Sequence, residues 1–314
     1  MKNLLRQAVT ISVWCALGVT ARAWGPAVHA YVGLEIGSSD GRLNRNQVYG
    51  AIAPDVVNYM FSSPHQADLY QATHFNFLPL WANASNRVQQ ALARGFSSHN
   101  MAWGADFTAH TSSLTLDPSR GYVIIKAELL AAELEANSLY ALARVPHDLT
   151  LQVAHELVEV AVDVLMQQSH PTLGHQLTAA VVARDSSYSR LFTRTYAAPL
   201  APFFGDSAAR ATVELRHAEQ RFRQLIIAYG HGLAGPPAQV VNRLATQEIR
   251  IAKEAAKAYG IQSLPPNSLL KPMFSQFVLR AMTLCQPDFA AEVNATVAAV
   301  AQELQRHGIT DPVP

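Results

Sequence analysis

Apolar residues recur every three or four positions along most of this sequence, and this spacing constrains the fold more than any other feature. The alternating pattern typical of β-strands is scarce. Because a helix places residues three and four apart on one face, the sequence predicts an all-α fold, a multi-helix bundle. Prolines and glycines separate the segments. The predicted helices cover residues 27–37, 84–95, 97–114, 121–143, 147–168, 173–184, 207–232, 237–258, 267–283 and 288–306.

The composition agrees with a folded chain and argues against one class of partner. Of the 314 residues, 49% are hydrophobic and 15% are charged, which is enough apolar material for a substantial core. Lysine and arginine together number 24 against 23 aspartates and glutamates. This balance does not favour a protein that binds nucleic acid through a strongly basic surface.

Residues 1–23 have the features of a cleaved secretory signal. Lys2 and Arg6 precede a mostly apolar run of twelve residues, and the small residues at 21–23 suit signal peptidase. We expect cleavage before Trp24 and export of the mature chain to a periplasm or out of the cell. An uncleaved N-terminal anchor is the alternative. No later stretch is apolar and long enough to span a bilayer, so we expect no transmembrane segment in the mature chain.

Cleavage at this point would change the charge and the cysteine content. It removes three basic residues and no acidic one, which leaves 21 basic against 23 acidic residues. It also removes Cys15, so Cys285 stands alone and an internal disulfide is excluded. An exported chain without a disulfide depends on its core, on bound metal, or on both.

The mature chain divides into two predicted parts. Residues 24–198 carry the motifs described below, and residues 199–314 form a helical extension without a motif that we can place. The proline-rich stretch 199–206 is the best candidate boundary between them. It could equally be an ordinary loop between helices, in which case the extension belongs to the same domain.

Two predicted helices each carry a histidine and an acid four residues apart. His155 and Glu159 share one helical face, and so do Asp106 and His110, which lets each pair meet one metal ion. The alternative for His155 and Glu159 is a solvent-exposed stripe. The alternative for Asp106 and His110 is a buried pair without a metal, since a buried carboxylate needs a cation or donors.

Three further positions carry weaker signals. Asp55 follows a proline and suits a helix cap as well as a metal ligand. His74 lies among apolar residues and could be a core histidine. A free amino group at Trp24 has an ordinary pKa of about 8, so it can lose its proton and bind metal, with His29 following one helical turn later.

Taken in order, these residues resemble the zinc-dependent phospholipase C family and the related zinc nucleases. The resemblance covers about residues 24–165 and implies an all-helical phospholipase C/zinc nuclease-like bundle, to which the additional C-terminal helices are joined. The matching motifs are Trp24-Gly25 with His29, Ala53-Pro54-Asp55, Thr73-His74-Phe75, Asp106 with His110, and His155 with Glu159.

The resemblance also implies a metal centre of about two to three zinc ions. Its ligands would fall into three sets. Trp24 and His29 would hold one ion, which Asp106 bridges to a second ion, and Asp55 and His74 would complete the shell of that second ion. His110, His155 and Glu159 would hold the third. All of these ligands are nitrogen or oxygen atoms, which suits zinc.

One position departs from the family pattern. The family has a histidine four residues before the bridging aspartate, where this chain has Ala102. His99 is a possible additional ligand, but in an unbroken helix it would lie roughly 10 Å along the axis from Asp106 and could not share its ion. We therefore expect the second ion to be weakly held, to be completed by water or to be missing.

The implied activity is hydrolysis of a phosphodiester by metal-activated water, with Asp55 orienting or deprotonating that water. We favour a phospholipase C that cleaves a glycerophospholipid at a membrane surface. A zinc nuclease acting on nucleic acid is the alternative within the same superfamily. A non-catalytic helical module that keeps one or two structural ions is the alternative from another class.

Overall fold

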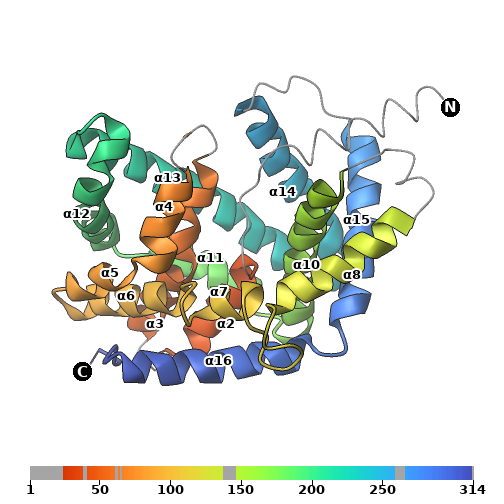
Figure 1. Ribbon diagram of the computed structural model, residues 1–314, viewed down its shortest axis with the longest axis horizontal. Coiled ribbons are helices and arrows are strands. Elements are labelled where there is room, and N and C mark those ends of the chain that lie inside the picture. The colour runs from red at the N-terminus through yellow and green to blue at the C-terminus, as the bar shows by residue number, and fades with distance from the viewer. Residues whose placement is uncertain are drawn as a thin grey trace.

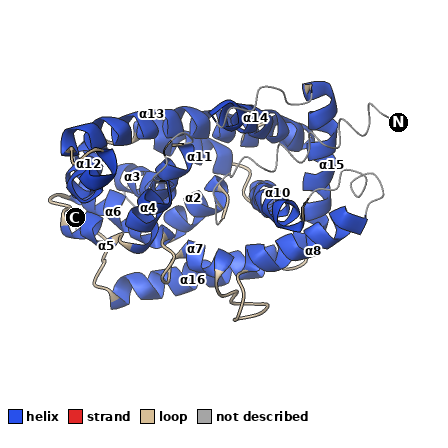
Figure 2. Ribbon diagram, turned by 45° about the horizontal axis from the view of Figure 1, so that its top comes forward, coloured by secondary structure: helices blue, strands red, loops and turns tan. Residues whose placement is uncertain are grey.

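The computed structural model describes residues 24–37, 41–60, 63, 66–136, 146–258 and 266–312. Within these ranges the regular structure is helical and contains no strand (Figures 1 and 2). This confirms the all-α prediction. The predicted signal, residues 1–23, lies outside the described residues, and so does the end of the helix predicted for residues 121–143.

The first half of the chain consists of short helices joined by tight turns. Several of them are only one or two turns long, and three of these short helices carry predicted ligands. The elements are α2 (Pro26–Glu35), α3 (Gly41–Ile52), η1 (Ala53–Tyr59), α4 (Gln66–Tyr70), η2 (Gln71–Phe75), α5 (Leu78–Ala82), α6 (Arg87–His99), α7 (Ala105–His110) and α8 (Tyr122–Ala136).

The second half consists mainly of long helices, and their bounds follow the predicted ones closely. The elements are α10 (His147–Ser169), α11 (Leu173–Ala183), α12 (Ser187–Leu200), η3 (Ala201–Phe204), α13 (Ala208–Leu233), α14 (Pro237–Ala258), α15 (Asn267–Cys285) and α16 (Phe289–Arg306). The sequence reasoning missed α12, which contains Pro199 near its end, and it missed α3.

α3 escaped prediction because part of its buried face is polar. Asn46 and Gln47 are almost fully buried, which interrupts the apolar period. Their side chains are satisfied inside the protein: the Asn46 amide donates to the Arg42 carbonyl, and the Gln47 amide donates to the Gly33 carbonyl. These hydrogen bonds offset the cost of burying the two polar side chains, but the spacing of apolar residues gives no sign of such bonds.

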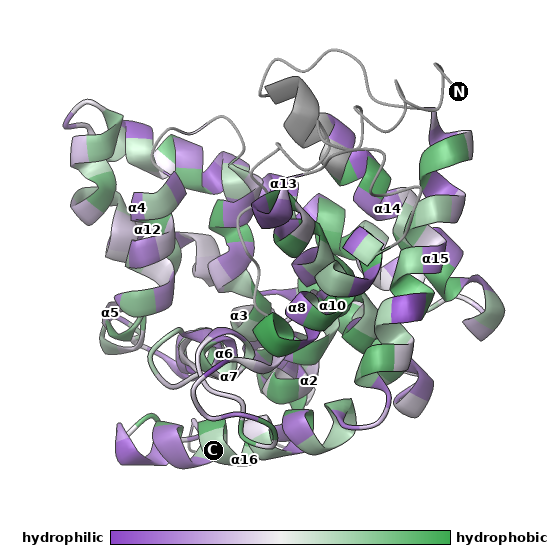
Figure 3. Ribbon diagram, turned by 45° about the vertical axis from the view of Figure 1, so that its right-hand side comes forward, coloured by the Kyte–Doolittle hydropathy of each residue, from purple (hydrophilic) through white to green (hydrophobic). Residues whose placement is uncertain are grey.

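Helix α2 lies at the centre of the fold, and α10 packs against it. Residues 26–33 of α2 are all buried, and most of α10 is buried as well. Figure 3 shows hydrophobic residues concentrated on these two helices, whereas α16 at the edge carries both kinds. α16 runs beneath α2, α6 and α7 in Figure 1 and contacts all three.

The two predicted parts of the mature chain share one core. Buried apolar side chains from residues 24–198 and from residues 199–314 form a single hydrophobic cluster. α13 packs against α11 and α12, and α15 packs against α10. Among the described helices, we find none with enough length and apolar character to cross a membrane.

Candidate metal centre

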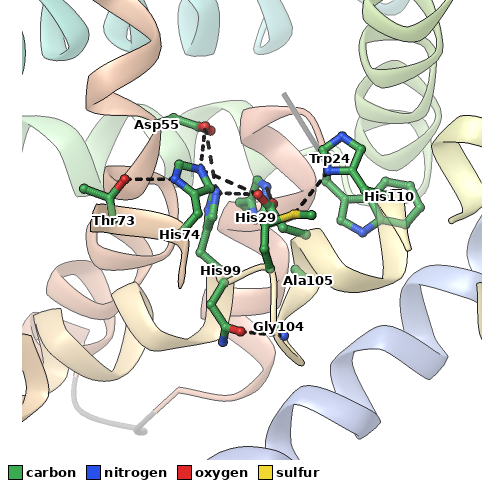
Figure 4. Close-up of polar contacts among 12 residues, drawn as sticks. Trp24, His29, Asp55, Thr73, His74, His99, Gly104, Ala105 and His110 are labelled. Carbon is green, nitrogen blue, oxygen red and sulfur yellow. Dashed lines mark hydrogen bonds and ion pairs between the residues drawn. The ribbon is translucent and has the colours of Figure 1, made fainter. Parts of the chain in front are cut away.

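Five separate segments bring histidines and aspartates to one buried place, which we call the Asp106 cluster. It consists of residues from α2, η1, η2, the end of α6 and the start of α7 (Figure 4). Each of these residues is at most 4% exposed. The members are His29, Asp55, His74, His99 and Asp106.

Asp106 lies in the middle of this cluster. Its Oδ1 is 3.2 Å from His29 Nε2, and its Oδ2 is 3.2 Å from His99 Nε2 and 3.6 Å from His74 Nε2. Asp55 Oδ1 lies 3.7 Å from His74 Nε2 and 3.8 Å from His99 Nε2. The Nε2 atoms of three imidazoles therefore converge on two carboxylates.

The position of His99 corrects the estimate made from an unbroken helix. The helix predicted for residues 97–114 is interrupted: α6 ends at His99, and α7 begins at Ala105. Asn100 has an extended ψ of 160°, and its Oδ1 accepts hydrogen bonds from the backbone N–H groups of residues 102, 103 and 104. This turn reverses the chain, so His99 and Asp106 face each other instead of lying two turns apart.

The same turn explains why Ala102 does not leave a gap. Ala102 is exposed on the turn, away from the cluster. His99 supplies the third imidazole from the preceding helix. The cluster thus contains three imidazoles although residue 102 is an alanine.

The packing of α3 against α6 fixes His99. Gly50 and Gly95 lie where these helices meet, and a Cβ atom at either position would overlap the backbone of the other helix. This close approach brings the carbonyl of Ala51 to 2.8 Å from His99 Nδ1. An N–H at Nδ1 that donates to this carbonyl leaves Nε2 of the neutral ring as the free acceptor, the state that a metal ligand needs.

Other members of the cluster also have partners that orient them. Thr73 Oγ1 lies 2.9 Å from His74 Nδ1, and the Asn58 amide donates to Asp55 Oδ1 at 2.6 Å. The Tyr70 ring stacks on His74 with centroids 3.8 Å apart. The sequence reasoning missed Tyr70, although its position one helical turn before His74 was a signal available in the sequence.

A second group of ligand-type side chains, the His110 cluster, consists of His110, His155 and Glu159. His110 Nε2 lies 3.1 Å from His155 Nε2, which lies 3.3 Å from Glu159 Oε1. His155 and Glu159 are 5% and 2% exposed. The interpretation of these two residues as a solvent-exposed stripe is therefore wrong.

Helix α7 links the two clusters, since Asp106 and His110 lie one turn apart on it. Trp24 packs against the same helix. Its indole Nε1 donates to Thr108 Oγ1 at 3.1 Å, and its ring is fully buried. The ligand role of the Trp24 amino group requires a free chain end and stays a prediction.

Burial and neighbouring charges shift the ionisation of these groups in the metal-free protein. Burial lowers the pKa of His29 and of His155, assisted by the nearby rings of His99 and His110 respectively. Both rings are therefore neutral at pH 7. Burial also disfavours charge on His99, but the carboxylates of Asp106 and Asp55 outweigh it and raise the pKa of His99 to about 9.

The same neighbours lower the pKa values of the two carboxylates. Burial alone would raise the pKa of Asp106, but His99 and His29 hold it well below its usual value. The pKa of Asp55 is also lowered, because His99, His74 and His29 outweigh burial. Both carboxylates are thus ionised at neutral pH and available to a cation.

The Asp106 cluster has the chemistry of a metal site. Five buried atoms of this cluster have no hydrogen-bond partner within the described residues: both ring nitrogens of His29, Nε2 of His74 and of His99, and Oδ1 of Asp106. Orphaned buried atoms of this kind are costly unless a cation or donor completes them. Three sets could each hold a metal ion: His29, Asp55 and His99; His74, His99 and Asp106; and His110, His155 and Glu159.

Comparison of the chain with known protein families, with curated proteins and with solved structures found no match.

Proposed function

We propose that the protein is an exported, zinc-dependent phosphodiester hydrolase, and most specifically a phospholipase C. The observation that carries the proposal is the burial of two adjoining clusters of metal ligands, joined by α7, with unsatisfied imidazole and carboxylate atoms at the centre. Nitrogen and oxygen ligands in such sets suit zinc and, where a shell is incomplete, leave room for water.

The ligands divide naturally between about two to three ions. Asp55, His74, His99 and Asp106 would hold one ion, with Asp106 shared with a second ion at His29 and the Trp24 amino group. His110, His155 and Glu159 would hold another. The addition of His99 removes the reason to expect a weak or missing ion at Asp55 and His74.

When bound, clustered zinc ions neutralise a phosphodiester anion and lower the pKa of a bound water. Asp55 is suited to orient that water or to accept its proton, because its carboxylate is ionised and the Asn58 amide fixes its rotation. His29 and His155 bind as neutral rings without first losing a proton. The low exposure of all these groups keeps bulk water away from the reacting atoms.

Exposed apolar side chains next to both clusters support a lipid substrate. Phe75 directly follows His74 and is 44% exposed, and Leu78 is 41% exposed. Beyond His110, Leu114 and Leu116 are 43% and 41% exposed. Large apolar side chains left in water beside a site suit contact with a lipid surface.

A zinc nuclease is the second candidate, and Phe75 is the observation that favours it. An exposed aromatic ring beside a phosphodiesterase site can stack on a nucleobase. Release of phosphocholine from phosphatidylcholine vesicles, measured beside release of nucleotides from single-stranded DNA, distinguishes the two. We expect the first product.

A matched pair of variants tests the enzyme itself. Glu159→Gln removes a ligand charge, and we expect loss of zinc at the His110 cluster and loss of activity. Glu156→Gln on the same helix alters a half-buried neighbour outside the ligand sets and should retain both. Wild-type protein without zinc would overturn the proposal, and zinc without hydrolysis of either substrate would point to the non-catalytic module.

A further inference from the structure

A buried carboxylate that takes no part in the ligand sets holds the start of α2. Asp163 lies on α10, one turn after Glu159, and is fully buried. Its Oδ1 accepts a hydrogen bond from Val28 N at 3.0 Å, and its Oδ2 accepts one from Ala27 N at 3.0 Å. The Tyr229 hydroxyl of α13 donates to Oδ2 at 2.8 Å.

The two backbone donors are the first free N–H groups of α2. Pro26 has no N–H, and Gly25 at the N-cap has no side chain to accept one, so the helix cannot cap itself. A carboxylate from another helix performs the capping and also meets the positive end of the helix dipole. Gly25 is required for this contact, because a Cβ atom there would lie 2.5 Å from the Asp163 carboxyl group.

Trp24 is held by a second set of contacts. Its indole donates to Thr108 Oγ1, and Thr108 Oγ1 lies 2.9 Å from Thr296 Oγ1 of α16. Its ring stacks on Tyr122 with centroids 5.3 Å apart. The first described residue is therefore fixed on one side by Asp163 beneath the helix start and on the other by α7, α8 and α16.

We propose that Asp163 has a docking role: it is a positioning residue that holds the mature amino terminus at the metal centre. Tyr229 and Thr296, from the C-terminal half, help to hold the amino terminus in the same place. This inference rests on the proposed function. The cap at Ala27 and Val28 sets the position of His29, which directly follows them in α2 and reaches Asp106. The C-terminal helices thus act on the site without supplying a ligand.

Asp163 must be ionised to hold the amino terminus in this way. Three donors converge on it, and only the ionised group has acceptors for all three. Burial raises the pKa of Asp163 to about 7, while the three donors oppose this rise. The test is therefore made at about pH 8, above that pKa.

Asp163→Asn is the main test. The amide keeps the shape of the side chain, but its NH2 group replaces one acceptor oxygen and places a donor opposite a backbone N–H. The variant is exported with its own leader, its first residue is identified by mass spectrometry, and zinc is titrated against a competing chelator. We expect the dissociation constant of the ion at His29 to rise by about 10-fold or more. The constant of the His110 cluster should stay within about 2-fold.

Asp148→Asn is the matched control, since Asp148 is an exposed acid in the first turn of the same helix. It should leave every zinc constant unchanged. If Asp163→Asn does not fold, Tyr229→Phe removes one of the three donors and should weaken the same constant by a smaller factor. A merely structural role would weaken all zinc constants together, including that of the His110 cluster, which overturns the docking role.

The outcome also separates the two proposals. Zinc in the wild type with unchanged constants in Asp163→Asn or Tyr229→Phe overturns the docking role alone. A wild type that binds no zinc overturns both.

Discussion

The contact between His99 and its two carboxylates can be tested by replacing His99 with glutamine. This change keeps a side chain of similar length in the cluster but cannot carry a positive charge. It removes the cation that faces Asp106 at 3.2 Å and Asp55 at 3.8 Å in the metal-free protein. It also removes an imidazole that, in our proposal, binds zinc.

The magnitude follows from the shift in the pKa of His99, from 6.5 to about 9. Each pH unit corresponds to about 1.4 kcal/mol, so the charged ring contributes about 3 kcal/mol to the free energy of unfolding. Because the pKa is higher in the folded protein than in the unfolded chain, this contribution is fully present below about pH 6.5. It declines as the pH rises and is lost above about pH 9.

The assay is urea unfolding of the chelator-treated protein at a series of pH values. We expect the difference in unfolding free energy between wild type and His99→Gln to shrink by about 3 kcal/mol between pH 6 and pH 10. Zinc titration adds an independent measurement. Zinc needs the neutral ring, so at about pH 7.5 the wild type should release about one more proton than the variant on binding.

If the unfolding free energies of the two proteins changed equally with pH, the reasoning would be refuted. That result would show that His99 carries no charge stabilised by the carboxylates. Proton release that is the same in both, measured by calorimetry in buffers of different ionisation enthalpy, would refute it separately. A loss of stability that is constant across the pH range would indicate a packing role instead.

The remaining predictions concern the turn, the chain start and the free thiol. Gly104→Ala should weaken zinc binding in a chelator titration, because its Cβ would lie within 2.6 Å of Asn100 backbone atoms; Gly41→Ala, with nothing within 4 Å, should not. A chain with one additional residue before Trp24 should bind one zinc fewer by metal analysis, since its terminal amine is displaced. Cys285 is buried, and burial raises the pKa of its thiol to about 12. At about pH 8 a thiol-reactive dye should therefore label it only after unfolding, and fast labelling of the native protein would contradict this.

Local spacing predicted the parts of the site that a single helix builds. His155 and Glu159 are four residues apart on α10, and Asp106 and His110 are four apart on α7. Such pairs depend only on the geometry of one helix, so the sequence is sufficient to place them. The long helices of the second half were predictable for the same reason, since their apolar faces repeat over many turns.

The juxtaposition of His99 with Asp106 was not predictable from spacing. It depends on Asn100, whose side chain accepts three backbone N–H groups and turns the chain between two helices. Because the apolar pattern continues on both sides of this turn, it predicts one unbroken helix. An Asn followed four residues later by Gly104 was the available signal, but asparagine and glycine also occur inside helices at modest cost.

The spacing of the ligands along the sequence does not predict that the site depends on the C-terminal half. The last ligand is Glu159, yet three buried polar side chains after residue 199 hold segments that carry ligands. Tyr229 meets Asp163 beneath α2, and Thr296 meets the hydroxyl that binds Trp24. Glu292 accepts hydrogen bonds from Ser113, Leu114 and Thr115, in the loop that follows His110.

Each of these three contacts joins residues more than 60 positions apart, and each is buried at least in part. Polar groups of this kind are costly to bury unless paired, so their pairing selects one arrangement of the helices over others with similar apolar faces. The ligands can therefore be recognised in the sequence up to residue 159, whereas their geometry is set by the whole chain. This is why the C-terminal helices carry no motif and still belong to the site.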